Sequence, residues 1–410
     1  MTVTVRSFAK INLGLRIGAP RPDGFHELLT VYQTIGLHDV IRITTSRGSG
    51  ITITCADPRV PRDESNTCFR IVEKALQALR TKAKVVIDID KRLPVQGGLG
   101  GASANAVATL LGLERALRKS LSAAEKLRIA AEVGSDLPLF LVGGAVLGVG
   151  RGEQVYPLSD FPAIPLVVVT PEVGVSTPKA FADWDHSQGL KPFSQSDRNA
   201  ALKRRSSTGV GRDLVLHEGS LELEETPPEL PSNWMWKSGP SELALSLPKG
   251  PRKTSTFNPG FSPSASEPET AAGLNCGSSS AKLTESPTSD RMNELGRALS
   301  AWLSEPFSGA PFRRGRAENP LLALVRAGIK NDFEQVVFPD YPELSEGKRA
   351  LLRAGANYAS LSGSGSTLYG LFDSRTAAVS AVARLRKQGW MAQASSTLTR
   401  RAYWKRVVAG

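Results

Sequence analysis

The sequence predicts a mixed α/β fold, because strand-like and helix-like segments alternate at both ends of the chain. The strand-like segments are short runs rich in β-branched apolar residues, such as Val40–Thr45 and Val85–Ile89. The helix-like segments repeat apolar residues at steps of three and four, as in Asn66–Leu79 and Ala123–Val133. With 410 residues, of which 40% are apolar, the chain has room for two or three domains.

The same two patterns predict further elements in both terminal blocks. We expect strands at Val3–Val5, Ile51–Cys55, Tyr358–Leu361 and Thr367–Phe372, and helices around Ala106–Leu117, Asn319–Ala327, Glu346–Ala354 and Arg375–Gln388. Residues 187–316 differ, because they are rich in Ser, Pro, Thr and Gly and bury too little apolar area to offset the entropy of ordering. We therefore expect a largely disordered insertion there, a bystander rather than a partner-binding arm or a lid.

Composition excludes several classes of protein. The net charge is +12, but it is spread along the chain and no zinc finger, RNA-binding sheet motif or basic helix accompanies it, which disfavours sequence-directed nucleic-acid binding. Cys55, Cys68 and Cys276 lie far apart, which argues against a disulfide framework or a zinc site. No apolar run is long enough for a membrane span and no secretory leader is visible, so we expect a cytoplasmic protein.

The strongest chemical motif is the glycine-rich loop Pro94–Asn105, which follows a predicted strand and opens a predicted helix. Its glycines let backbone amides approach a ligand, and the helix start adds unpaired N–H groups, so together they form a cradle for phosphates. Ser103 is placed to donate to a phosphate or to contact Mg²⁺. The alternative is a glycine-rich turn needed only for packing. The spacing matches neither a P-loop nor a dinucleotide fingerprint.

Four other motifs carry less weight when each is taken alone. Ser362–Ser366 is a glycine turn between strands, Gly134–Pro138 is a turn containing an Asp, Ala9–Leu13 has a Lys at a strand end, and Asp23–Leu28 places Phe beside His. Each has an ordinary structural explanation as a turn, a cap or a solvated side chain.

Taken together and in their order along the chain, the five motifs resemble those of the GHMP kinase superfamily of galacto-, homoserine, mevalonate and phosphomevalonate kinases. The segments Thr177–Phe181 and Asn331–Glu334 add to the resemblance. The Lys-Ile-Asn and Asp-Gly-Phe-His-Glu motifs most resemble the branch that phosphorylates a methylerythritol linked to cytidine diphosphate, in the non-mevalonate isoprenoid pathway.

The resemblance implies two α/β domains with a cleft between them. The first, residues 1–160, would be an ATP-binding domain like the second domain of ribosomal protein S5. The other, residues 161–186 and 317–410, would be ferredoxin-like, with 187–316 as an insertion. The resemblance implies ATP and Mg²⁺ as cofactors, a small-molecule alcohol as acceptor, and a monomer or weak homodimer.

The resemblance also implies site residues. Asp136 would be the general base and Lys10 a cation that stabilises the charge of the transferred group. The triphosphate would be held by Pro94, Val95, Gln96, Gly97, Gly98, Leu99, Gly100, Gly101, Ala102, Ser103 and Ala104, with Ser103 contacting Mg²⁺. The acceptor would be bound by Asn12, Phe25, His26, Thr177, Phe181, Gly363 and Gly365.

Some positions depart from the family pattern. Phe25 stands where the family generally has Tyr, which keeps a stacking face but loses a hydroxyl. Ala102 and Ala104 replace residues that are commonly Gly and Ser, and Ser135 replaces a usual Ala. Two alternatives remain at this point: another GHMP-type kinase acting on homoserine or a mevalonate-like alcohol, and a non-catalytic nucleotide- or RNA-binding module.

Overall fold

A long antiparallel ribbon organises the first half of the chain. The computed structural model describes residues 1–189 and 330–407. The ribbon consists of β1 (Thr2–Pro20) and β2 (His26–Ser46), and β2 also pairs with β4 and β5 along its other edge. The sheet order is β3-β4-β2-β5-β6, completed by β3 (Gly50–Cys55), β4 (Lys84–Asp90), β5 (Ala145–Val149) and β6 (Gln154–Pro157).

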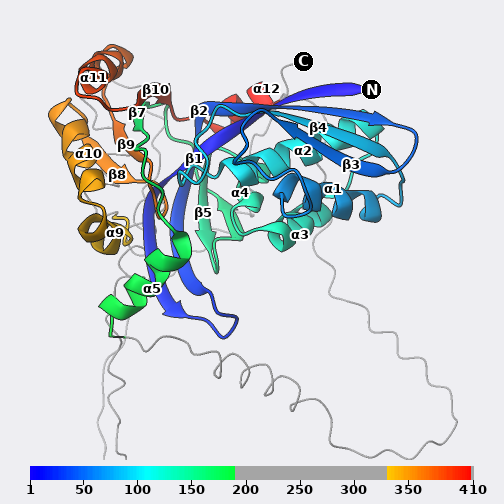
Figure 1. Ribbon diagram of the computed structural model, residues 1–410, viewed down its shortest axis with the longest axis horizontal. Coiled ribbons are helices and arrows are strands. Elements are labelled where there is room, and N and C mark those ends of the chain that lie inside the picture. Colours follow the sequence, from blue (N-terminus) through cyan, green and yellow to red (C-terminus); the bar gives the residue numbers. More distant parts are fainter. Residues whose placement is uncertain (190–329, 408–410) are drawn as a thin grey trace, which may run out of the picture. The chain divides into compact units, whose positions relative to one another are not determined.

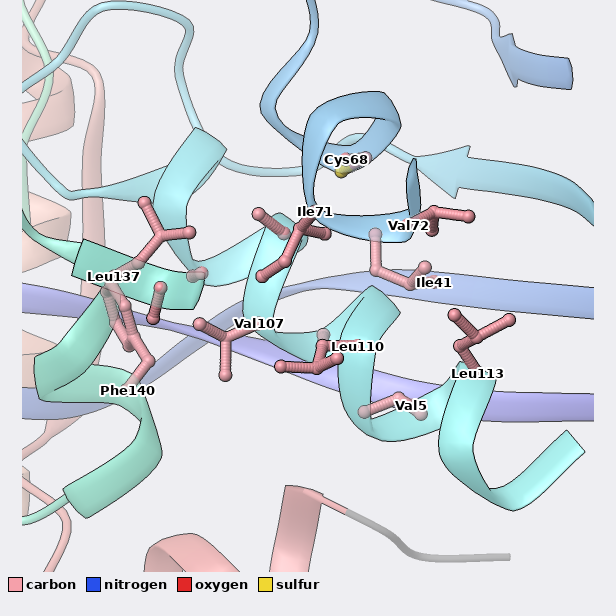
Figure 2. Packing of buried hydrophobic residues seen from close by; sticks show 14 of the residues in the cluster. Val5, Ile41, Cys68, Ile71, Val72, Val107, Leu110, Leu113, Leu137 and Phe140 are labelled. Carbon is pink, nitrogen blue, oxygen red and sulfur yellow. The ribbon is translucent and has the colours of Figure 1, made fainter. Parts of the chain in front are cut away.

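Helices cover this first sheet and bury its apolar side chains (Figure 1). They are α1 (Thr67–Ala78), α2 (Gly101–Leu117), α3 (Ala123–Val133), α4 (Leu137–Val142) and the C-terminal α12 (Arg400–Val407). Figure 2 shows Val5 of β1 and Ile41 of β2 near Val107, Leu110 and Leu113 of α2, all fully or almost fully buried. This packing fixes the start of α2 against the sheet.

The second sheet has the order β10-β7-β9-β8. Its strands are β7 (Pro165–Val169), β8 (Tyr358–Leu361), β9 (Leu368–Leu371) and β10 (Ala392–Ser396), and α10 (Pro342–Arg353) and α11 (Arg375–Lys387) pack on it. Chain order β-α-β-β-α-β with the fourth strand beside the first is the ferredoxin-like arrangement, so the predicted mixed α/β fold with two sheets is confirmed. Two more helices, α5 (Thr177–Ser187) and α9 (Glu334–Asp340), border this domain.

Most predicted elements appear within one or two residues of their expected ends. Two expected strands are parts of longer ones: Val3–Val5 is the start of the 19-residue β1, and Val40–Thr45 lies near the end of the 21-residue β2. The helices expected around Ala106–Leu117 and Glu346–Ala354 begin earlier, at Gly101 and Pro342. Most of β1 from Val5 onward is buried, so it lacks the polar alternation that identifies a half-exposed strand. The helix expected at Asn319–Ala327 and all but the first three residues of the expected insertion 187–316 lie outside the described residues. None of the described helices has the length and apolar composition to span a bilayer.

A short segment before α9 ties β1 to the second sheet. The amide of Leu15 donates to the carbonyl of Lys330, and the amide of Asp332 donates to the carbonyl of Leu15. The Asp332 carboxylate accepts from Arg16 Nη1 at 2.9 Å and from the amide of Ile17 at 3.0 Å. Asp332 is fully buried and Arg16 is 5% exposed, so each charge depends on partners inside the protein.

Substitution of Asp332 by Ala should lower the free energy of unfolding by about 3–5 kcal/mol, because it leaves the Arg16 guanidinium buried without its carboxylate. Urea denaturation followed by circular dichroism measures the change. The matched control is Asp88→Ala, which removes an exposed ion pair with Arg42 and should cost less than about 1 kcal/mol. Equal losses in the two variants would contradict a structural role for the buried pair.

Candidate active site

A cavity of about 1000 Å³ is lined by residues of both sheet domains. Its walls come from the middle of β1, the first part of β2, the segment that leads into α1, the glycine-rich loop before α2, the residues just before α4, the helix α5 and the turn between β8 and β9. The residues that form it are therefore far apart in the sequence and meet only in the fold. A cavity of this size lies at the upper end of the range for small-molecule sites.

The glycine-rich loop forms one wall of the cavity and ends at the N-terminus of α2. Gly98 and Gly100 have φ of +73° and +67°, a region that side-chain-bearing residues rarely adopt. Gly100 occupies the N-cap position and no side chain caps the helix, so the amides that follow it lack intrahelical partners. No acidic residue lies in the first turn of α2. This end of the cavity is therefore suited to an anion.

The turn between β8 and β9 closes directly on the glycine-rich loop. Ser362 Oγ donates to the Gly98 carbonyl at 3.0 Å, and the amide of Thr367 donates to the Gly97 carbonyl at 3.2 Å. Asn331 Nδ2 donates to the carbonyl of Gly363 at 2.7 Å and so braces the turn from behind. A Cβ on Gly98 would collide with the Ser362 carbonyl oxygen, so the close approach requires glycine.

Lys10 lines the cavity and is 4% exposed. Its ammonium donates to Asn12 Oδ1 at 2.7 Å and lies 3.4 Å from Asp136 Oδ2. Asn12 Nδ2 in turn donates to Thr30 Oγ1 at 2.8 Å, which fixes the orientation of the amide. The structure thus brings together the lysine and the aspartate that the sequence singled out, from elements more than 100 positions apart.

Tyr32 holds the other oxygen of Asp136. Its hydroxyl donates to Asp136 Oδ1 at 3.1 Å, and its ring lies 5.6 Å from the Lys10 ammonium. Burial, and then the Asp136 carboxylate, raise the pKa of Tyr32 well above its usual value, so the phenol stays protonated and acts as a donor. Asp136 immediately precedes α4 and its side chain is 32% exposed, which leaves it open to the cavity.

The cavity has an aromatic end, formed where the start of β2 meets α5. The rings of His26 and Phe181 are stacked, with centroids 4.9 Å apart and planes at 13°. His26 Nε2 forms a hydrogen bond with Asp185 Oδ1 at 2.7 Å. Phe25 is 49% exposed, and the Arg151 guanidinium lies 5.0 Å from its ring. Aromatic faces beside a histidine form a site suited to a planar heterocycle.

Most of the residues expected in the site line this one cavity. They are Lys10, Asn12, Phe25, His26, every residue from Pro94 to Ser103, Asp136, Thr177, Phe181 and Gly363. Ala104 does not line it, because its side chain faces the apolar core between the first sheet and its helices. Gly365 does not line the cavity either. It lies within the turn between β8 and β9, next to Leu361 and Gly98.

Several residues that hold the site together belong to none of the sequence motifs. Tyr32 and Thr30 sit within an ordinary β2 strand, and Asp185 lies one helical turn beyond the Phe181 motif. Ser364, whose hydroxyl lies 2.7 Å from the Thr177 hydroxyl, was visible only as part of the glycine turn. Of these residues, only Asp185 could be predicted from local spacing, because it lies four residues after Phe181 and so on the same face of the helix.

Two family models match the chain: the GHMP kinase N-terminal domain at residues 66–144 and the GHMP kinase C-terminal domain at residues 316–389. A 4-diphosphocytidyl-2-C-methyl-D-erythritol kinase from Solibacter usitatus (strain Ellin6076) is 30% identical, and the match covers 99% of this chain and 92% of the relative. The kinase of the same name from Synechococcus sp. (strain JA-2-3B'a(2-13)) is 31% identical over 94% of this chain and 90% of its own length.

Solved structures agree on the fold. A crystal structure of 4-(cytidine 5'-diphospho)-2C-methyl-D-erythritol kinase matches with a TM-score of 0.56 at 22% identity, over 96% of this chain and 99% of that one. A homoserine kinase from Cytophaga hutchinsonii matches with a TM-score of 0.55 at 16% identity, over 97% of this chain and 95% of that one. The chain is a small-molecule kinase of the GHMP superfamily, and it belongs to the 4-diphosphocytidyl-2-C-methyl-D-erythritol kinase family.

Proposed function

We propose that the protein transfers the γ-phosphoryl group of ATP to the 2-hydroxyl of 4-diphosphocytidyl-2-C-methyl-D-erythritol, a step of the non-mevalonate isoprenoid pathway. The names of the relatives support this substrate. The observation that carries the proposal is that the Lys10–Asp136 pair lines the same cavity as the glycine-rich loop and the aromatic residues Phe25, His26 and Phe181. That arrangement suits an alcohol linked to a nucleotide.

Asp136 is the proposed general base. Its carboxylate is open to the cavity, and Tyr32 and Lys10 hold its two oxygens, so its orientation is fixed before substrate binds. An acceptor hydroxyl within hydrogen-bond distance of Asp136 would give up its proton to this carboxylate as the bond to phosphorus forms. The reaction needs positioning and charge stabilisation more than covalent catalysis, and a preorganised carboxylate supplies the first.

Lys10 is the proposed electrostatic stabiliser. Its ammonium lies beside Asp136 and about as close to the second glycine turn, where a Cβ on Gly363 would lie 3.5 Å from Nζ. A cation in this position favours the ionised form of the acceptor hydroxyl and offsets the negative charge of the transferred phosphoryl group. Because Lys10 is buried, solvent screens this interaction little.

The glycine-rich loop is the proposed binding site of the ATP phosphates, through the free amides at the start of α2. Ser103 lies in that first turn and lines the cavity, so its hydroxyl fits a site for Mg²⁺ held mainly by phosphate oxygens. Among the described residues there is no group of three or more His, Cys, Asp or Glu that would bind a metal by itself. When bound, Mg²⁺ would neutralise phosphate charge.

The aromatic end is the proposed cytidine site. His26 and Phe181 are stacked directly on each other, so a pyrimidine does not fit between these two rings. Phe25 supplies a further aromatic face at the same end of the cavity and replaces the tyrosine usual in the family. Thr177 and Asn12 also line the cavity, and Asn12 contacts Lys10, so both are proposed to bind the alcohol.

The activity is tested by ADP release. With ATP and Mg²⁺, the protein should release ADP when the cytidine-linked methylerythritol is added, and not with homoserine or mevalonate. Cytidine diphosphate should inhibit competitively, because it fills the aromatic end without presenting the hydroxyl. Turnover of homoserine or mevalonate in its place would overturn the proposed substrate.

Replacement of Asp136 by Asn should lower kcat by about 10²–10⁴-fold, because the amide cannot take the proton. KM should change little, since Asn keeps the shape of the side chain. Lys10→Met should also lower kcat strongly. Steady-state kinetics measure both effects, with Asp88→Asn on the exposed surface as the control. Wild-type turnover in Asp136→Asn, in a folded protein, would remove Asp136 from the reaction.

Replacement of Tyr32 by Phe should lower kcat about tenfold while the fold persists, because the Asp136 carboxylate loses one of the donors that orient it. The phenylalanine retains the ring packing around Lys10. The comparison of kcat with thermal unfolding separates orientation from stability. A loss of stability with unchanged kcat would show that the hydroxyl serves only the fold.

A further inference from the structure

We infer that Asp185 is a positioning residue that fixes which ring nitrogen of His26 carries the proton, and that this lets the site distinguish cytosine from uracil. The inference rests on the proposed function, since it concerns the base end of the same cavity. Nothing in the motifs of the sequence pointed to Asp185, which lies one turn beyond Phe181 on α5.

The contact is short and shielded. His26 Nε2 and Asp185 Oδ1 are 2.7 Å apart, and the two side chains are 8% and 19% exposed. Phe181 and Asp185 are four residues apart, so α5 presents both on one face. Phe181 sets the plane of the imidazole by stacking, and Asp185 sets its rotation within that plane. Together they leave His26 a single orientation.

This orientation determines the position of the proton. A carboxylate only accepts hydrogen bonds, so the neutral imidazole must carry its hydrogen on Nε2. Nδ1 is then an acceptor, and among residues 1–189 and 330–407 no hydrogen bond to His26 Nδ1 is formed. His26 lines the cavity, and within the described part of the chain Nδ1 is not among the fully buried polar side-chain atoms that lack a partner, so this lone pair is accessible to a bound base.

An acceptor at this point distinguishes the two pyrimidines. Cytosine carries an exocyclic amine that donates to Nδ1, whereas uracil carries a carbonyl oxygen at the same ring position. The oxygen would place lone pair against lone pair, and a mismatch of this kind rejects a ligand strongly. Without Asp185 the ring could carry its hydrogen on either nitrogen, and the discrimination would weaken.

The neighbouring charges do not take over this role. Arg151 lies against the Phe25 ring and pairs with Glu153, and Asp183 pairs with Lys179 at 2.7 Å on the exposed side of α5. Asp183 therefore serves as a matched control: it is a carboxylate on the same helix, two residues away, that does not line the cavity.

The first experiment is ¹⁵N NMR of the full chain with labelled histidine, in which His26 is assigned by its loss in His26→Gln. In the wild type the His26 hydrogen should reside on Nε2. In Asp185→Asn, whose amide can both donate and accept, the ring should become a mixture of tautomers. Asp183→Asn should match the wild type. An unchanged tautomer in Asp185→Asn would overturn the inference.

The second experiment compares the cytidine-linked substrate with its uridine-linked analogue. Asp185→Asn should raise KM for the cytidine-linked substrate about tenfold, keep kcat within about twofold, and lower the cytidine-to-uridine ratio of kcat/KM about tenfold. Asp183→Asn should keep the wild-type ratio. Equal losses for both substrates would show a merely structural role and overturn the inference. Absence of ADP release by the wild type would instead overturn the proposed function, while the NMR result would still decide the role of Asp185.

Discussion

The site depends on one buried cation. The Lys10 ammonium is almost inaccessible to water, so Asn12 and Asp136 must compensate its desolvation within the protein. The backbone of the same residue is also fixed, because its amide donates to the Leu99 carbonyl at 3.0 Å. One residue therefore aligns the carboxylate at α4 with the glycine-rich loop. Displacing Lys10 would disturb both the charge balance and the position of the loop.

The second constraint is the close approach of two backbone turns. Gly98 and Ser362 come too close for any side chain on Gly98, and Gly363 has φ +60°. The approach is held from behind by Asn331, next to the buried Asp332 that anchors the segment to β1. The stability of the buried ion pair and the shape of the cavity are thus linked through adjacent residues, although neither charge lines the cavity.

Local patterns in the sequence were sufficient for most of the elements, whereas the convergence of the motifs in one site was implied only by their resemblance to the GHMP kinase superfamily. The ends of α3 and β8 follow directly from periodicity, and Ser122 and Glu125 cap α3 in the way their spacing indicates. Partners across the fold were beyond such patterns. Tyr32 meets Asp136 only because β2 passes α4, and no spacing within the chain encodes that meeting.

The chain leaves the described structure after α5 and re-enters it at Lys330, and both points contact residues of the first domain. On one side the chain departs from α5, whose Phe181 and Asp185 contact His26, and on the other it returns at Lys330, whose carbonyl is bound by Leu15. Both boundaries are secured by contacts of their own. A change at either boundary would therefore act on the cavity, through the His26 ring on one side and through β1 on the other.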